Sequence, residues 1–537
     1  MKFIKNLKKF NNKIIKATCI ITSFMFLTTT LTSCSLLSSN NTPIKNTTLK
    51  IAGSEQLINT GKMVSPWREI SIFTRLSFRN IFTVDSITNE IKPDLAKSYS
   101  VSSDGLVYTM VIRDDLIWSD GEPINIDDII FSIKASVLDN DYTMIFPIAF
   151  DNINGVSDFL NGDSDEIAGL SVDYENNIFI ITLDNPIANF PQVLSQFTIL
   201  PKHILKDEDL SNLATNDFWS DPIVSGMYKL GEYIPNEQLT YVYNDKYIDA
   251  VPNIESITVR SDYEFKEVDY YTTNDISEIM DFRTMFAMKE IDIEALYYRY
   301  LIFNIDKNGE PDPVLSDIRI RQAIAYSIDN ETLVGDIYYK TGTPIDSGLV
   351  SGSDRAYTYD PQKSKDLLAE ANYDFNRPLV LLHYYEDETS IKFMEKMEEY
   401  LQAVGFKTEI IHSGDIYSEE YDTYDIGLKS LSAFDLTEWY AEYHSSHDLY
   451  KNVFGGEPLF DELINNLNAT ITPEDKINAL TDLQILAYNS LYKYPIFTMN
   501  YKAYVNTTRL TIPDEVVIGN PTYKYDNEFE NWVIKNE

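Results

Sequence analysis

The sequence predicts an α/β protein with more than one lobe, and three observations support this. The chain has 537 residues, which is longer than a domain with a single hydrophobic core usually is. Short β-rich runs, at 379–384 and 408–411, alternate with amphipathic helical segments in the second half. No internal repeat, low-complexity tract or second hydrophobic span interrupts the chain. We therefore expect at least two compact α/β bodies.

Strand and turn signals are strongest in the first half. Asp104-Gly105 is a hairpin pair, because both residues tolerate positive φ, and the β-branched and aromatic run at 106–113 predicts a strand. Residues 174–183 show the same hairpin-and-strand pattern. A turn cluster at 118–123 is followed by Asp127, which we expect to cap a helix whose apolar residues face a core.

Helix signals are more regular in the second half. An isoleucine recurs at every fourth position from 320 to 328, and Asp317 stands where the N-cap belongs. Further along, Asp360 suits an N-cap, Pro361 suits the first helical turn, and Asn372 suits a left-handed ending. These segments predict helices that begin and end at identifiable residues.

The N-terminus predicts a secretion signal. Residues 1–16 contain six lysines and no acidic residue, and an apolar, Thr-rich run follows at 17–31. Residues 31–34 resemble a bacterial lipobox, which implies cleavage before Cys34 and transfer of diacylglycerol to its thiol. A membrane-spanning anchor is the alternative, but the run is shorter than the roughly 20 residues that a span needs.

Cysteine and charge limit the function classes. The other cysteine, Cys19, falls in the predicted leader, so a mature chain has no disulfide and no zinc-cysteine site. Loss of the leader lysines takes the net charge from −39 to −45, which repels nucleic acid and anionic lipid. Membrane attachment is then expected through the acyl chains alone, with residues 34–48 as a polar tether.

Residues 93–134 resemble the signature of the family 5 extracellular solute-binding proteins, the peptide and nickel receptors of bacterial ABC importers. Segments elsewhere match the family in order and spacing; these are 200–205, 300–304, 319–329, 360–373, 401–406 and 458–464. Two places depart from it. Residues 224–228 keep one glycine of the usual turn and lose its proline, and residues 262–294 contain no glycine where relatives usually have one.

The resemblance implies a type II periplasmic-binding-protein-like fold with an extra subdomain in the N-terminal lobe. The implied boundaries are a signal peptide at 1–33, a tether at 34–48, lobe I at 49–75, 195–290 and 498–537, the extra subdomain at 76–194, and lobe II at 291–497. The chain would cross between the lobes near residue 290 and return near residue 497.

Catalytic motifs are missing from the sequence. It has no His-Glu-x-x-His pair, phosphate-binding glycine loop or Gly-x-Ser-x-Gly elbow, so we expect no enzyme and no cofactor. The acidic loop 161–165 lacks the ligand spacing of a calcium hand. His444 and His447 have helix-compatible spacing and keep a nickel or nickel-chelate receptor open as an alternative.

The ligand-site residues come from the resemblance and from ligand chemistry. A peptide receptor needs a fixed carboxylate for the ligand amine, exposed backbone partners and aromatic walls. Asp435 lies where peptide-binding relatives place their amine-binding aspartate, and Glu55 lies where relatives line the cleft. Trp439, Tyr298 and Tyr300 are the expected aromatic walls, although strand aromatics more often pack in cores.

These observations predict a monomeric, lipid-anchored receptor on the outer face of the cytoplasmic membrane. Its expected partners are a peptide ligand and the membrane subunits of an ABC permease. Ligand is expected to close the lobes, and the permease then distinguishes the closed receptor from the open one. Receptors for nickel, haem or another small solute are the alternative within the same family. A surface enzyme or adhesin that reuses the fold is the alternative from another class.

Overall fold

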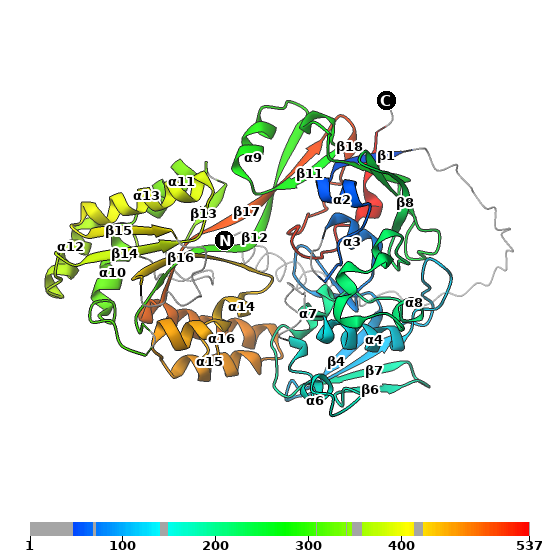
Figure 1. Ribbon diagram of the computed structural model, residues 1–537, viewed down its shortest axis with the longest axis horizontal. Coiled ribbons are helices and arrows are strands. Elements are labelled where there is room, and N and C mark those ends of the chain that lie inside the picture. Colours follow the sequence, from blue (N-terminus) through cyan, green and yellow to red (C-terminus); the bar gives the residue numbers. More distant parts are fainter. Residues whose placement is uncertain are drawn as a thin grey trace, which may run out of the picture.

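The computed structural model describes residues 47–67, 71–139, 149–307, 309–339, 341–345, 357–412 and 423–535. They form two bodies connected by long strands (Figure 1). Within these ranges, no helix has the length and apolar character that a membrane span requires. The predicted leader, Cys34 and most of the predicted tether lie outside the described residues.

The first body contains a mixed four-stranded sheet. Its order is β1 (Thr48–Ala52), β10 (Ser256–Arg260), β9 (Gln238–Tyr243) and β8 (Tyr228–Ile234). β1 is parallel to β10 and the other neighbours are antiparallel. Thr48, the last residue of the predicted tether, already pairs with Ser256 in this sheet.

A second, fully antiparallel sheet belongs to the same half of the molecule. Its order is β4 (Ala96–Val101), β5 (Val107–Ile112), β7 (Ile178–Thr182) and β6 (Leu170–Asp173). The accompanying elements are α2 (Glu55–Thr60), α3 (Ile72–Ser77), β2 (Phe82–Val84), β3 (Ile91–Pro93), α4 (Ile126–Leu138), α6 (Val156–Leu160), α7 (Phe190–Gln196), α8 (Lys202–Leu205) and the 3₁₀ turns Leu210–Thr215, Asp217–Ser220 and Phe265–Glu267.

The hairpin prediction is confirmed and one cap prediction is wrong. Gly105 lies between β4 and β5 with φ of 74°. The cap of α4 is Asn125, whose side chain accepts from the Asp127 N–H, and Asp128 completes a capping box. Asp127 is inside the first turn, because two better-placed acceptors flank it; its own carboxylate accepts from the Tyr174 hydroxyl.

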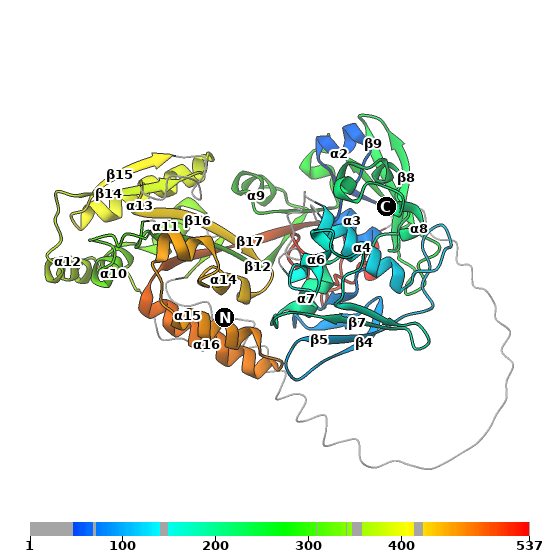
Figure 2. The ribbon, with the colours of Figure 1, turned by 60° about the horizontal axis from the view of Figure 1, so that its bottom comes forward.

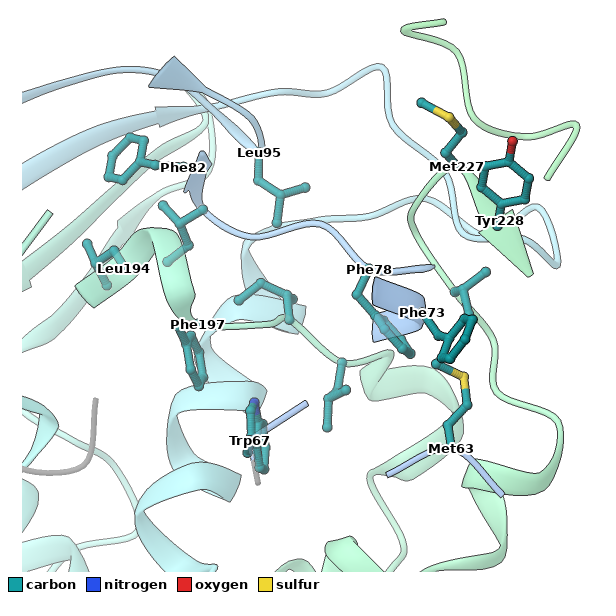
Figure 3. Close-up of a cluster of buried hydrophobic side chains, with 14 of the residues drawn as sticks. Met63, Trp67, Phe73, Phe78, Phe82, Leu95, Leu194, Phe197, Met227 and Tyr228 are labelled. Atoms are coloured by element: carbon teal, nitrogen blue, oxygen red, sulfur yellow. The ribbon is translucent and has the colours of Figure 1, made fainter. Parts of the chain in front are cut away.

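One hydrophobic core joins both sheets of this half. Met63, Trp67, Phe73, Phe78 and Phe197 belong to it, together with residues of β2, α7 and β8 (Figure 3). Trp67 stacks on Phe197 with ring centroids 5.8 Å apart, and its indole N–H donates to a backbone carbonyl 3.0 Å away. The predicted extra subdomain therefore shares its core with the rest of this half.

Gly226, the glycine kept at 224–228, is required by close backbone contact. A Cβ there would lie 2.5 Å from the Leu76 carbonyl oxygen and 2.5 Å from the Ser77 carbonyl carbon. We expect Gly226→Ala to lower the free energy of unfolding by about 1–3 kcal/mol in urea denaturation. Gly335→Ala is the control, since its Cβ meets nothing within 4 Å; equal stabilities of the two variants would contradict the packing argument.

The second body is built on a seven-stranded sheet. Its order is β11 (Tyr270–Thr273), β17 (Lys493–Asn506), β12 (Met288–Phe303), β16 (Ile426–Ala433), β14 (Pro378–His383) and β15 (Lys407–His412), with β13 (Gly342–Pro344) beside β17. β14, β15 and β16 run parallel to one another. Their carboxyl ends consequently share one edge of the sheet.

Helices cover both faces of this sheet (Figures 1 and 2). One layer contains α10 (Ile318–Ser327), α11 (Asn330–Ile337), α12 (Pro361–Glu370) and α13 (Glu388–Ala403), and one core lies beneath it. The other layer contains α14 (Leu436–Ala441), α15 (Leu459–Asn468) and α16 (Pro473–Ser490), over a separate core. The predictions of Asp317 and Asp360 as N-caps, and of Asn372 with positive φ, are confirmed.

Two strands run from one body into the other. In β12, Ile293 packs in the core of the first body, whereas Leu301 packs in that of the second. In β17, Val505 packs in the core of the first body and Phe497 in that of the second. The pairing of these strands shifts register between Ile293 and Tyr297, in the stretch that separates the two cores. A break of this kind allows the ladder to bend there.

The remaining elements are α9 (Ile276–Arg283), the π-helical turn Tyr450–Phe454, the 3₁₀ turn Phe529–Asn531, and the short pair β18 (Leu510–Thr511) and β19 (Val533–Ile534). After β17 the chain returns to the first body. There Lys524 donates to the Asn80 side chain at 2.9 Å, and the Lys524 backbone is bonded to Gln196. The domain boundaries expected from the sequence remain a prediction.

Candidate ligand-binding site

The carboxyl edge of the parallel strands is the candidate ligand-binding site. In open α/β sheets, ligands bind outside the carboxyl ends of the strands. Residues 384–387 follow β14 at this edge, and Phe434 and Asp435 follow β16. Phe434 packs against Tyr523 and Tyr525, at centroid distances of 5.0 and 5.6 Å, from the segment that returns to the first body. The edge therefore faces the first body.

Asp435 is the N-cap of α14 and is largely buried. One carboxylate oxygen accepts from the Thr437 N–H at 2.9 Å, and the other accepts from the Lys476 ammonium at 2.9 Å. Burial opposes ionisation of the carboxyl, but the Lys476 ammonium and the Thr437 N–H outweigh it, so the pKa of Asp435 lies below its usual value. A ligand amine at Asp435 would have to displace or share Lys476.

Glu438 is the second acid at this helix start and has no cation partner in the described residues. Its Oε1 atom completes a capping box by accepting from the N–H groups of Asp435 and Phe434, at 3.1 and 3.2 Å. Burial and the negative charge of Asp435 raise the pKa of Glu438 to about 8. At neutral pH this carboxyl is mostly protonated, and it adds little charge to the site.

This raised pKa predicts a pH-dependent stability. Between about pH 4.5 and 8 the unfolded chain ionises Glu438 while the folded chain keeps the proton, so stability falls as the pH rises. We expect the stability of Glu438→Gln relative to the unsubstituted chain to rise with pH across this range, by up to about 1.4 kcal/mol per pH unit. Urea denaturation of both proteins at several pH values measures the difference. A pH-independent difference would contradict the assigned protonation state.

Three predicted aromatic residues lie together beside α14. The ring of Trp439 is 5.2 Å from that of Tyr298 and 4.9 Å from that of Tyr300. Their exposed fractions are 2%, 2% and 0%, so the rings pack in the core beneath α15 and α16. This arrangement does not bring the rings to the surface. Their contact with ligand remains a prediction.

A buried charge network fixes this aromatic cluster. Glu442 accepts from the Tyr300 hydroxyl at 3.0 Å and from the Lys493 ammonium at 2.9 Å. The same ammonium donates to the Trp439 carbonyl at 2.9 Å and lies 3.9 Å from the Trp439 ring centroid. Lys429 approaches Glu442 at 3.4 Å. This network joins β12, β16 and β17 to α14 and to Glu442, which is the C-cap of that helix.

The other predicted residues lie apart from this edge or outside the description. Cys34 is not among the described residues, and Glu55 is the first residue of α2, capped by Ser54, with no description of its side chain. His444 and His447 lie in a turn, where His444 contacts Ser446 and His447 accepts from the Leu449 N–H. The described ranges contain no group of three or more His, Cys, Asp or Glu residues suited to a metal ion.

Sequence reasoning missed Lys476 and gave Glu438 no role of its own. The pattern Asp435-x-x-Glu438 is a capping-box signature, so it could have placed both acids at one helix start. Lys476 is 41 positions from Asp435, and no local pattern connects them.

Comparisons with known proteins agree with this architecture. The family model described as bacterial extracellular solute-binding proteins, family 5 (middle region), matches residues 90–456. The chain belongs to this family. A Brucella ovis protein named as an ABC transporter peptide-binding protein is 26% identical over 351 residues, which are 61% of this chain. The chain spans 61% of the length of the first curated relatives that it matches.

Solved structures share the fold across nearly the whole chain. CtaP from Listeria monocytogenes, an ABC transporter substrate-binding protein, is similar with a TM-score of 0.71 and 19% identity, over 91% of this chain and 99% of that one. NikZ from Campylobacter jejuni, solved with Ni(L-His), is similar with a TM-score of 0.66 and 21% identity, over 91% and 99%. The predicted type II periplasmic-binding-protein-like α/β fold is confirmed.

Proposed function

We propose that this family 5 protein captures peptides outside the cell and delivers them to the membrane subunits of an ABC importer. The observation that carries the proposal is the acidic start of α14. Asp435 and Glu438 lie there at the carboxyl edge of the second body, next to Phe434, which packs against Tyr523 and Tyr525. An ionised carboxylate for the ligand ammonium, which Asp435 supplies, and aromatic walls for varied side chains are what a peptide receptor needs.

In this proposal the ligand bridges the two bodies and shifts their equilibrium toward closure. The register break between Ile293 and Tyr297 in β12 is where the connecting strands would bend. The receptor acts as a monomer held at the outer face of the cytoplasmic membrane by acyl chains on Cys34. Binding involves no covalent change in the ligand, so recognition and release are the whole cycle.

A metal complex is the second candidate ligand, and one observation favours it. His383 and His412 are in register at the carboxyl ends of β14 and β15, with ring centroids 5.1 Å apart. Nδ1 of His383 has no hydrogen-bond partner in the described part of the chain. Burial and the neighbouring His412 lower the pKa of His383, which favours the neutral, metal-binding form of the ring.

Native mass spectrometry of the full chain, purified in detergent, separates these candidates. Heterogeneous co-purified masses that fragment as peptides support the first proposal, and a single metal-containing mass, checked by elemental analysis, supports the second. Turnover of an added peptide pool would contradict both, because it would show an enzyme. Intact-mass measurement of the membrane-extracted protein tests Cys34 separately, since a chain without diacylglycerol would remove the anchor from the proposal.

A further inference from the structure

A buried aromatic ring crosses from the second body into the first, beside the strands that connect them. Phe434 directly follows β16 and is 1% exposed. It forms a small core of its own with Val84 and Tyr523, and Ile91 and Tyr525 pack against this core. Within the described ranges, Phe434 is the one member of the cluster from the second body. We call Phe434 the pin and the other four residues the socket.

The socket is built into the first body. Val84 and Ile91 are paired in the β2–β3 ladder. The Asp526 N–H donates to the Val84 carbonyl at 2.9 Å, which fastens the segment of the two tyrosines to β2. Between those tyrosines, Lys524 is buried and its backbone is bonded to the Gln196 side chain. The socket is therefore expected to move with the first body.

The pin is fixed to the second body by its backbone. Ala433, the residue before it, pairs with Leu296 of β12. The Phe434 N–H donates to the Glu438 carboxyl at the start of α14, at 3.2 Å. Leu296 lies inside the register break between Ile293 and Tyr297. The pin therefore stands next to the place where the connecting strands can bend.

A second contact between the bodies shares no residue with the pin or its socket. Ala188, in the loop before α7, packs against the core beneath α15 and α16. Figures 1 and 2 both show α7 beside α16. An alanine side chain buries less apolar surface than a phenylalanine ring, so this contact costs less free energy to break than the pin does.

We propose that the two bodies turn about the Phe434 pin, and that the Ala188 contact is the part of their interface that opens. Withdrawing the pin would expose a phenylalanine ring and the faces of two tyrosines to water. A rotation that keeps the ring seated avoids this cost, and it breaks the weaker contact instead. The inference concerns the motion, so it goes beyond the proposed function and does not depend on which ligand is bound.

Distances between the bodies test this inference on the full chain in detergent, without added ligand. Spin labels are attached through unnatural amino acids at two exposed positions, Ser157 on α6 and Asn466 on α15, and read by double electron–electron resonance. Ala188→Glu places a carboxylate against an apolar core, so it should lengthen the mean distance and leave the width of the distribution unchanged. Phe434→Ala frees the axis, so it should widen the distribution by at least about twofold.

The socket side gives an independent check. Tyr523→Ala should widen the distribution as Phe434→Ala does, and the double variant should be no wider than either single one, because both remove the same contact. Ile91→Ala trims the socket and should also widen the distribution, which covers the case in which Phe434→Ala fails to fold.

Phe393→Ala is the matched control, because Phe393 is a fully buried phenylalanine within the second body alone. It should lower the melting temperature and leave both the mean distance and the width unchanged. An unchanged width in the pin and socket variants would overturn the inference, and so would an equal widening in Phe393→Ala. Peptide capture is measured separately by native mass spectrometry, so the proposed function can stand where this inference fails, and the reverse.

Discussion

Replacing Glu442 with glutamine should lower the free energy of unfolding by about 3–5 kcal/mol, because it removes one partner from a buried ion pair. Glu442 is 7% exposed and bonded to Lys493, which is 2% exposed. In the variant, Lys493 keeps its hydrogen bond to the Trp439 carbonyl and loses its carboxylate partner. The loss should appear as a lower urea midpoint with an unchanged denaturant slope.

The pH dependence of this effect gives an independent check. Burial opposes ionisation of Glu442, but Lys493 and Lys429 outweigh it and lower its pKa to about 2. Its stabilising contribution is therefore complete above the unfolded pKa of 4.5 and is lost as the pH falls toward about 2. The stability difference between the two proteins should shrink across that range.

Glu399→Gln is the control for this prediction. Glu399 forms an exposed pair with Lys396 on α13, so its removal should leave the urea midpoint unchanged. If Glu442→Gln behaved like this control at pH 7, the buried network would not contribute to the stability of the second body.

Local signals explain which parts of the fold were predictable. Asp317 and Asp360 cap their helices as expected, because a cap needs only a side chain and backbone a few positions away. The same logic was wrong at Asp127, since Asn125 and Asp128 compete for the same backbone groups. Helix starts are therefore predictable from sequence to within a few residues, and the capping residue itself depends on its neighbours.

The site was less predictable, because its decisive contacts join distant segments. Asp435 was found through the family resemblance, whereas its partner Lys476 comes from α16. Phe434 directly precedes Asp435, and the residues around its ring come from β2, β3 and the segment that returns to the first body. Such partners become visible only after the strands are paired.

Blocking the ligand amine by acetylation should weaken peptide binding by at least about tenfold, and Asp435→Asn should abolish that preference. Both expectations follow if the Asp435 carboxylate accepts the ligand ammonium. Lys476 now occupies one oxygen of this carboxylate at 2.9 Å, as a ligand amine would. We therefore expect Lys476→Met to strengthen binding of free-amine peptides by about threefold to tenfold, because the ligand no longer competes with an internal ammonium.

A pool of short peptides with free ends and its N-acetylated counterpart provide the measurement, as bound fractions in native mass spectrometry. Lys451→Met is the matched control, since Lys451 is an exposed lysine whose ion-pair partner, at 4.0 Å, is Asp448 and not Asp435. It should leave both pools unchanged. Weaker binding in Lys476→Met would show that the lysine supports the site and does not compete within it. An unaltered amine preference in Asp435→Asn would remove Asp435 from the pocket.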